Sequence, residues 1–232
     1  MTELEIPVRF YRDFPEAYDY GFETLKLELE YSTFLLVDVD WDWIEPVHTI
    51  SQEYIAPALA AARQAGMLVT YVHNDLRLLA DAGGQISEFW TKTKNMAGML
   101  QWQLKNAAWQ PQYMECLRPL PNERNFPKWI WSGFRDTFLD HYFRSLEIKN
   151  LFTVGYSQRA CLHYTLAEAM SLNYRVILLR DCSYAQEMPD TELPGSPDYG
   201  WVNRVTLRNI EHLIGYTTTS PEFINALQQA KR

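Results

Sequence analysis

Two side chains with complementary chemistry stand at the ends of separate apolar runs in this sequence. Asp38 lies near the end of the run 33–39, TFLLVDV, and Cys161 follows the run 151–155, LFTVG, after a short turn. A thiol can attack a carbonyl carbon once a nearby carboxylate takes its proton. Cys161 also falls where a helix should begin, and the N–H groups of a helix N-terminus favour a thiolate and a developing oxyanion. The pair therefore indicates cysteine nucleophilic catalysis with Asp38 as the base.

These two residues can meet only if the fold brings distant strands to one edge of a sheet. Short apolar runs rich in β-branched residues predict buried strands at residues 33–39, 67–72, 151–155 and 175–179. Helical patterns separate them, at residues 47–65, 136–146 and 161–172. The alternation predicts an α/β fold, a three-layer α-β-α sandwich with a central, mainly parallel sheet. Ligands bind such sheets at the carboxyl ends of the strands, where Asp38 and Cys161 would lie.

The rest of the chain fits around one such unit. We expect a single domain over residues 1–232, because no linker, repeat or low-complexity tract divides it. Residues 1–30 are rich in aromatic side chains and are expected to form an N-terminal arm that packs on this subunit or on a neighbouring one. Residues 78–127 contain Gly83-Gly84, several prolines and a helical pattern, and are expected to be an insertion over the active site.

Composition excludes several classes of function. The formal charge of −8, with no cluster of basic residues, argues against a nucleic-acid partner. No apolar stretch reaches the roughly 18–20 residues of a membrane span, and the N-terminus lacks the pattern of a signal peptide. We therefore expect a cytoplasmic protein without a membrane partner. Three cysteines without CxxC spacing indicate free thiols and no structural zinc site.

Three segments of the chain follow patterns of a known enzyme superfamily. Residues 35–43, LLVDVDWDW, are similar to a strand-ending LLVIDMQNDF, and residues 128–137, KWIWSGFRDT, to K-x-x-x-S-A-F-x-x-T. Residues 155–161, GYSQRAC, look like G-V-A-T-N-V-C. In this order, the three segments resemble the isochorismatase-like cysteine hydrolases, which include nicotinamidases, N-carbamoylsarcosine amidase, ureidoacrylate amidohydrolases and biuret hydrolases. The resemblance extends from about residue 33 to the C-terminus.

The resemblance assigns roles to particular residues. It implies a catalytic triad of Asp38, Lys128 and Cys161, in which Lys128 pairs with Asp38. The implied activity is hydrolysis of a C–N bond in a small amide, ureido or N-carbamoyl substrate through a Cys161 thioester. No cofactor is implied, and no metal is expected, because the Asp-x-His pattern of the nicotinamidases is missing. The resemblance also implies a homodimer or homotetramer.

The turn before Cys161 supplies the remaining expectations. The resemblance implies a cis peptide between Tyr156 and Ser157, which would direct the Ser157 N–H toward the substrate. With the Cys161 N–H it would form an oxyanion hole of two donors. Trp41, close to Asp38, and Gln158, at the pocket mouth, are the expected substrate-binding residues; both positions depart from the superfamily's patterns.

Two other functions remain open at this stage. An isochorismatase-type enzyme would hydrolyse a vinyl ether with the aspartate and without a thiol nucleophile, so the presence of Cys161 argues against it. A catalytically inactive binding protein on the same fold is the second alternative, because a fold does not dictate a function. Retention of Asp38, Lys128 and Cys161 together argues against that one.

Overall fold

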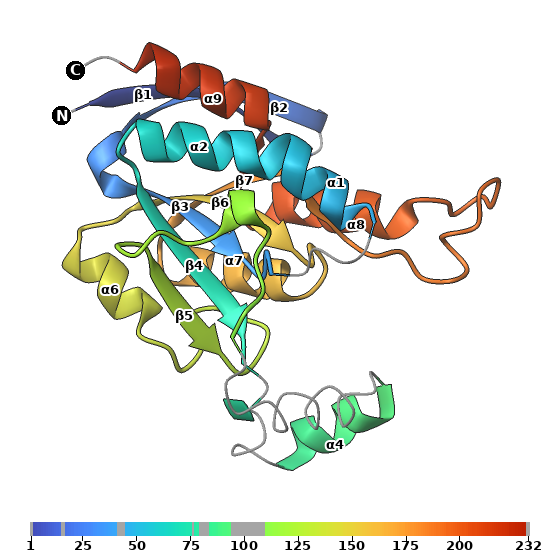
Figure 1. The fold of residues 1–232 in the computed structure, drawn as a ribbon. Helices are drawn as coiled ribbons and strands as arrows, with labels where there is room; N and C mark the ends of the chain where they lie inside the picture. Colours follow the sequence, from blue (N-terminus) through green and yellow to red (C-terminus); the bar gives the residue numbers. More distant parts are fainter. Residues whose placement is uncertain are drawn as a thin grey trace.

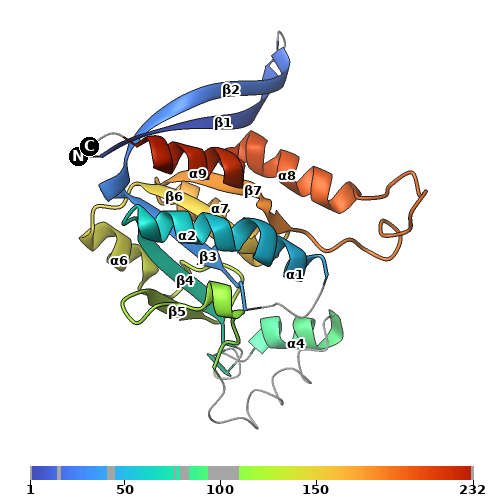
Figure 2. The ribbon, with the colours of Figure 1, turned by 45° about the horizontal axis from the view of Figure 1, so that its top comes forward.

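The computed structural model describes residues 2–14, 17–40, 45–75, 77–78, 84–93 and 110–230. Its centre is an eight-stranded sheet with the order β2-β1-β8-β7-β6-β3-β4-β5. Neighbours from β8 to β5 run parallel, and the β1–β2 hairpin is antiparallel and joins the sheet along β8. Helices cover both faces (Figures 1 and 2). The expected three-layer α/β fold is confirmed.

The bounds of the elements are as follows. The strands are β1 Glu3–Phe14, β2 Ala17–Glu28, β3 Ser32–Val37, β4 Leu68–Asn74, β5 Arg124–Lys128, β6 Asn150–Tyr156, β7 Arg175–Tyr184 and β8 Tyr216–Thr218. The helices are α1 Val47–Ile50, α2 Ala56–Gln64, α4 Gly84–Thr93, α6 Leu139–Ser145, α7 Cys161–Ser171, α8 Trp201–Leu213 and α9 Ser220–Gln229. A π-helical segment, η2 Ser51–Ile55, joins α1 to α2, and short 3-10 turns lie at Leu29–Tyr31 and Glu115–Leu117.

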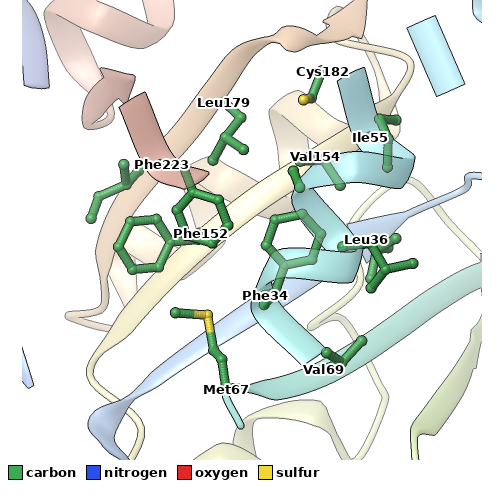
Figure 3. Close-up of a cluster of buried hydrophobic side chains, with 14 of the residues drawn as sticks. Phe34, Leu36, Ile55, Met67, Val69, Phe152, Val154, Leu179, Cys182 and Phe223 are labelled. Atoms are coloured by element: carbon green, nitrogen blue, oxygen red, sulfur yellow. The ribbon is translucent and has the colours of Figure 1, made fainter. Parts of the chain in front are cut away.

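Apolar side chains of the central strands pack on both faces of the sheet, as expected for strands covered by helices. On one face, Phe34 and Phe152 pack against Phe223 of α9, with ring centroids 5.4 and 4.9 Å from it. Figure 3 shows these rings in one buried cluster that also contains Val154, Leu179 and Ile55 of η2. On the other face, Leu35 and Val37 pack in a cluster with residues of α6, α7 and α8. None of the helices in the described part of the chain is long and apolar enough to cross a membrane.

The N-terminal segment, which was expected to be an arm, is instead part of the central sheet. They form the β1–β2 hairpin, and Leu4, Ile6, Val8 and Leu27 are buried in the same core cluster as α9. The Arg9 guanidinium also donates to the buried Glu211 carboxylate of α8, with Nε 2.8 Å from Oε1. Strands β1 and β2 therefore extend the sheet, a placement that the aromatic composition of this part of the chain did not predict.

The expected insertion at 78–127 is only partly described. Its last residues, from Arg124, belong to β5, so the excursion from the sheet ends earlier than expected. The predicted helical pattern appears as α4, and residues 94–109 lie outside the described residues. In both ribbon views α4 lies beyond the carboxyl ends of β4 and β5 (Figures 1 and 2). Whether this segment covers the active site stays a prediction.

Candidate active site

Four neighbouring strands each deliver one polar side chain to the carboxyl edge of the sheet. Asp38 directly follows β3, Asn74 ends β4, Lys128 ends β5, and Cys161 follows β6 at the first residue of α7. The strand order β6-β3-β4-β5 places these ends in a row. Residues up to 123 positions apart in the chain therefore share one site, because parallel strands end at the same edge.

Asp38 and Lys128 form a buried ion pair. The Lys128 Nζ lies 2.9 Å from Asp38 Oδ2, and the side chains are 0% and 3% exposed. Burial by itself lowers the pKa of Lys128, but the Asp38 carboxylate and the Cys161 sulfur outweigh it, and the pKa is raised above its usual value. Lys128 is therefore an ammonium group at neutral pH.

The Cys161 thiol lies beside this pair. The Asn74 amide joins its sulfur to both members, and the charges of Asp38 and Lys128 both act on its pKa. Burial, together with the negative charge of Asp38, raises the pKa of the thiol to about 12, although Lys128 acts in the opposite direction. Burial and the neighbouring Asp38 thus outweigh the favourable effect that the helix start is expected to have on a thiolate, and the thiol keeps its proton at neutral pH.

Asn74 joins the three groups and was not identified as a functional residue from the sequence. Its Nδ2 donates to Asp38 Oδ2 at 3.2 Å and to Cys161 Sγ at 3.5 Å. Its Oδ1 accepts a hydrogen bond from Lys128 Nζ at 2.6 Å. The available signal was its position as a polar residue at the end of an apolar strand, the same signal that identified Asp38.

A second link joins the segment that follows Lys128 to the nucleophile's helix. The Thr165 hydroxyl donates to the Cys161 carbonyl at 2.7 Å and accepts from the Gly133 N–H at 2.9 Å. The Gly133 backbone approaches closely here, since a Cβ on it would lie 3.2 Å from Val72. Gly133 and Thr165 thus fasten the segment that follows Lys128 to α7.

The turn between β6 and α7 has the geometry that the resemblance implied. The peptide between Tyr156 and Ser157 is cis. The Tyr156 hydroxyl anchors the end of β6 through Ser51 Oγ at 3.0 Å and the Val47 carbonyl at 3.1 Å. In this fully described turn, the backbone donors are the amides of Gln158, Ala160 and Leu162, whereas those of Ser157, Arg159 and Cys161 are not among the donors. The Ser157 and Cys161 N–H groups, which the resemblance implies as the oxyanion hole, are thus candidates for binding an oxyanion.

The expected substrate-binding residues are less well defined. Gln158 is buried beside the nucleophile, and its backbone N–H donates to the Tyr184 carbonyl at 2.9 Å. Trp41 lies outside the described residues. Their roles in binding substrate stay predictions.

A polar chain on β4 and β5 borders the site. His73 Nδ1 lies 2.7 Å from Asn125 Oδ1, and Asn125 Nδ2 donates to the Tyr113 hydroxyl at 2.9 Å. Burial lowers the pKa of His73, which therefore is neutral at pH 7. Among the residues that the structure describes, no three His, Cys, Asp or Glu side chains gather closely enough to hold a metal ion. The expectation of a metal-free enzyme stays a prediction.

Comparisons with known proteins agree with this architecture. A sequence model of the isochorismatase domain matches residues 32–192. The ureidoacrylate amidohydrolase RutB of Agrobacterium fabrum is 30% identical over 183 residues, which cover 76% of this chain and 75% of that protein. RutB of Cronobacter turicensis is 30% identical over 186 residues, covering 77% of this chain and 75% of that protein.

Solved structures share the fold. A cysteine hydrolase from Pseudomonas syringae pv. phaseolicola aligns with a TM-score of 0.69 at 22% identity, covering 87% of this chain and 94% of that one. N-carbamoylsarcosine amidase from Thermoplasma acidophilum aligns with a TM-score of 0.52 at 20% identity, covering 82% and 96%. The domain model spans most of the chain, and the relatives cover about three quarters of it. The resemblance seen in the sequence is confirmed, and the chain is a hydrolase that belongs to the isochorismatase family.

Proposed function

We propose that the chain is an amidohydrolase that cleaves a C–N bond of a small amide, ureido or N-carbamoyl substrate through a thioester on Cys161. The observation that carries the proposal is the gathering of the Cys161 thiol, the Asp38 carboxylate and the Lys128 ammonium group around the Asn74 amide at one edge of the sheet. Relatives at 30% identity named ureidoacrylate amidohydrolase support the substrate class.

The proposed reaction starts from a neutral thiol. Asp38 takes the thiol proton, and the resulting thiolate sulfur forms a bond to the substrate carbonyl carbon, whose oxygen becomes an oxyanion. The N–H groups of Ser157 and Cys161 donate to that oxygen. The protonated Asp38 then gives its proton to the leaving nitrogen, the C–N bond breaks, and a Cys161 thioester remains.

Water completes the proposed cycle. Asp38, ionised again, takes a proton from a water molecule while the water oxygen attacks the thioester carbonyl. Collapse of that intermediate breaks the C–S bond, and the proton on Asp38 returns to the sulfur. Lys128 keeps its charge throughout and offsets the negative charge that alternates between Asp38 and the sulfur.

The test is a screen for release of ammonia or amine from ureidoacrylate, N-carbamoyl amino acids, biuret and small amides. We expect turnover of at least one of them, and loss of that turnover in Cys161→Ala and Asp38→Asn. Rapid quenching with mass spectrometry should find an acyl adduct on the peptide that contains Cys161. Turnover retained in Cys161→Ala contradicts the thioester route, and a parent that hydrolyses none of these compounds contradicts the amidohydrolase proposal and leaves the aspartate-based vinyl-ether chemistry as the alternative.

We also propose a homo-oligomer in the cytoplasm, with the outer strand of the hairpin as the subunit contact. Phe14, Tyr18 and Phe22 are exposed along this hairpin, and β2 forms the edge of the sheet. Long apolar edges of this kind favour association. A Tyr18→Lys, Phe22→Lys variant should reduce the mass measured by light scattering, and an unchanged mass would exclude this contact.

A further inference from the structure

We propose that Asn74 is a fourth catalytic residue, whose amide compensates the negative charge at both ends of the proton transfer from Cys161 to Asp38. The proposal rests on the proposed function, because it assigns Asn74 a part in the first step of that reaction. It goes beyond the triad of Asp38, Lys128 and Cys161, which the sequence patterns already indicated.

The contacts of Asn74 determine which way its amide faces. Lys128 Nζ has only hydrogens to donate, and it lies 2.6 Å from one end of the amide, so that end is the oxygen Oδ1. The NH2 end then faces Asp38 Oδ2 at 3.2 Å and Cys161 Sγ at 3.5 Å. A single nitrogen therefore directs its two hydrogens toward the proton acceptor and the proton donor of the same step.

This geometry suits a step in which a negative charge moves from the Asp38 carboxylate to the Cys161 sulfur. Before the transfer the negative charge lies on Asp38, and afterwards it lies on the sulfur, while the proton has moved the other way. Hydrogen bonds to ionised groups are about twice as strong as those between neutral groups. The Asn74 NH2 group has a charge-assisted bond in either state, and it does not have to rotate between them. A preorganised donor of this kind acts on the transition state without reorganisation.

The neighbouring strands keep the amide in place. Asn74 is the last residue of β4, and its backbone pairs with Lys128 of β5. The next residue continues the connection, since the Asp75 N–H donates to the Lys128 carbonyl at 2.9 Å. β3 flanks the other side of β4 and leads directly into Asp38. The residue is thus held between the two strands that present the ion pair.

Alkylation of Cys161 tests the proposal without any knowledge of the substrate. The second-order rate constant for iodoacetamide is measured from pH 7 to 9 by mass spectrometry of the Cys161 peptide, which separates it from the exposed Cys116. Asn74→Leu keeps a similar side-chain size but removes all three hydrogen bonds of the amide, those to Asp38 and Cys161 and that from Lys128. We expect the rate constant to fall at least about tenfold at every pH, because hydrogen bonds to charged groups commonly contribute that factor or more. Asn74→Asp adds a negative charge beside the sulfur and should lower it further.

Asn150→Leu is the matched control. Asn150 is a buried amide at the amino end of β6, where its Nδ2 donates to Ser32 Oγ at 3.1 Å and its Oδ1 accepts from Arg175 at 2.9 Å. Its loss should lower the melting temperature without changing alkylation of Cys161. Equal alkylation rates in Asn74→Leu and the parent overturn the proposal, and so does an equal decrease in Asn74→Leu and Asn150→Leu.

The same variants separate this proposal from the proposed function. With an active substrate, Asn74→Leu should lower kcat by about 10²–10³-fold, the usual effect of removing one donor to a developing charge, and should change KM much less. If the parent hydrolyses no amide but Asn74→Leu still slows alkylation selectively, the amidase assignment fails and the role of Asn74 at the thiol stands.

Discussion

The ion pair between Lys128 and Asp38 offers the sharpest test of the site's electrostatics. Lys128→Met replaces the ammonium group by an uncharged side chain of similar length. The Asp38 carboxylate, which is 2% exposed, then retains Asn74 as its donor, while its Oδ1 has no hydrogen-bond partner among the described residues. The variant therefore leaves a buried negative charge with little compensation.

The size of the effect follows from the geometry. Two unit charges 2.9 Å apart attract each other by about 6 kcal/mol at an effective dielectric constant of about 20. Removal of one partner of a buried pair commonly costs about 3–5 kcal/mol, since the remaining charge partly relaxes or takes up a proton. For a chain of this size, about 2–4 °C of melting temperature corresponds to each kcal/mol. We expect Lys128→Met to melt roughly 6–20 °C below the parent.

Urea denaturation of a double-mutant cycle provides the assay. Asp38→Asn combined with Lys128→Met removes both charges, and this double variant should be more stable than Lys128→Met alone by at least about 2 kcal/mol. Lys26→Met is the control, because the Lys26–Glu5 pair has a similar separation of 3.0 Å but is exposed to solvent. Its melting temperature should equal that of the parent. A Lys128→Met variant that melts with the parent, or a double variant no more stable than the single one, would refute the reasoning.

Three further predictions concern the fold around the site. Gly155→Ala should abolish folding or lower the free energy of unfolding by more than about 4 kcal/mol, because Gly155 has a φ of +120° and an added Cβ would lie 2.0 Å from the Val37 carbonyl oxygen. Gly66→Ala is the control, since Gly66 has a φ of +74° and open space around it. In the same denaturation assay it should lower the free energy of unfolding by only about 1–2 kcal/mol. Arg9→Leu should destabilise the protein by about 2–4 kcal/mol, because it leaves the fully buried Glu211 carboxylate with Thr217 as its remaining donor; an unchanged urea midpoint would show that the hairpin does not depend on this pair. The folded state raises the pKa of Cys161 from 9.0 to about 12, so between these pH values the folded protein keeps the thiol proton that the unfolded chain releases. This contribution to stability is complete below pH 9 and is lost as the pH rises toward 12, so Cys161→Ala should lose less stability between pH 9 and 10 than the parent, by up to about 1.4 kcal/mol. Parallel pH profiles of the two proteins would contradict the buried neutral thiol.

The sequence determined the type of fold and part of the site. Runs such as FLLV at residues 34–37 are apolar at every position, and only a strand covered on both faces buries all of them. From that pattern follow the parallel sheet and the edge to which Asp38 and Cys161 belong. Lys128 was identified through the motif around it, since a single lysine carries no such signal.

The tertiary structure decided which side chains meet and what state they are in. The role of Asn74 could be identified only once β4 was known to lie between β3 and β5. The order of strands in a sheet is set by long-range packing, which a local sequence pattern does not contain. The β1–β2 hairpin was missed for the same reason, because its inner face is buried against the distant helix α9 and it is joined to α8 by pairs such as Arg9–Glu211 and Asp13–His212. The protonation of Cys161 depended on burial beside a carboxylate. A sequence gives the identity of a titratable group, whereas the solvent and the charges around it exist only once distant segments have folded together.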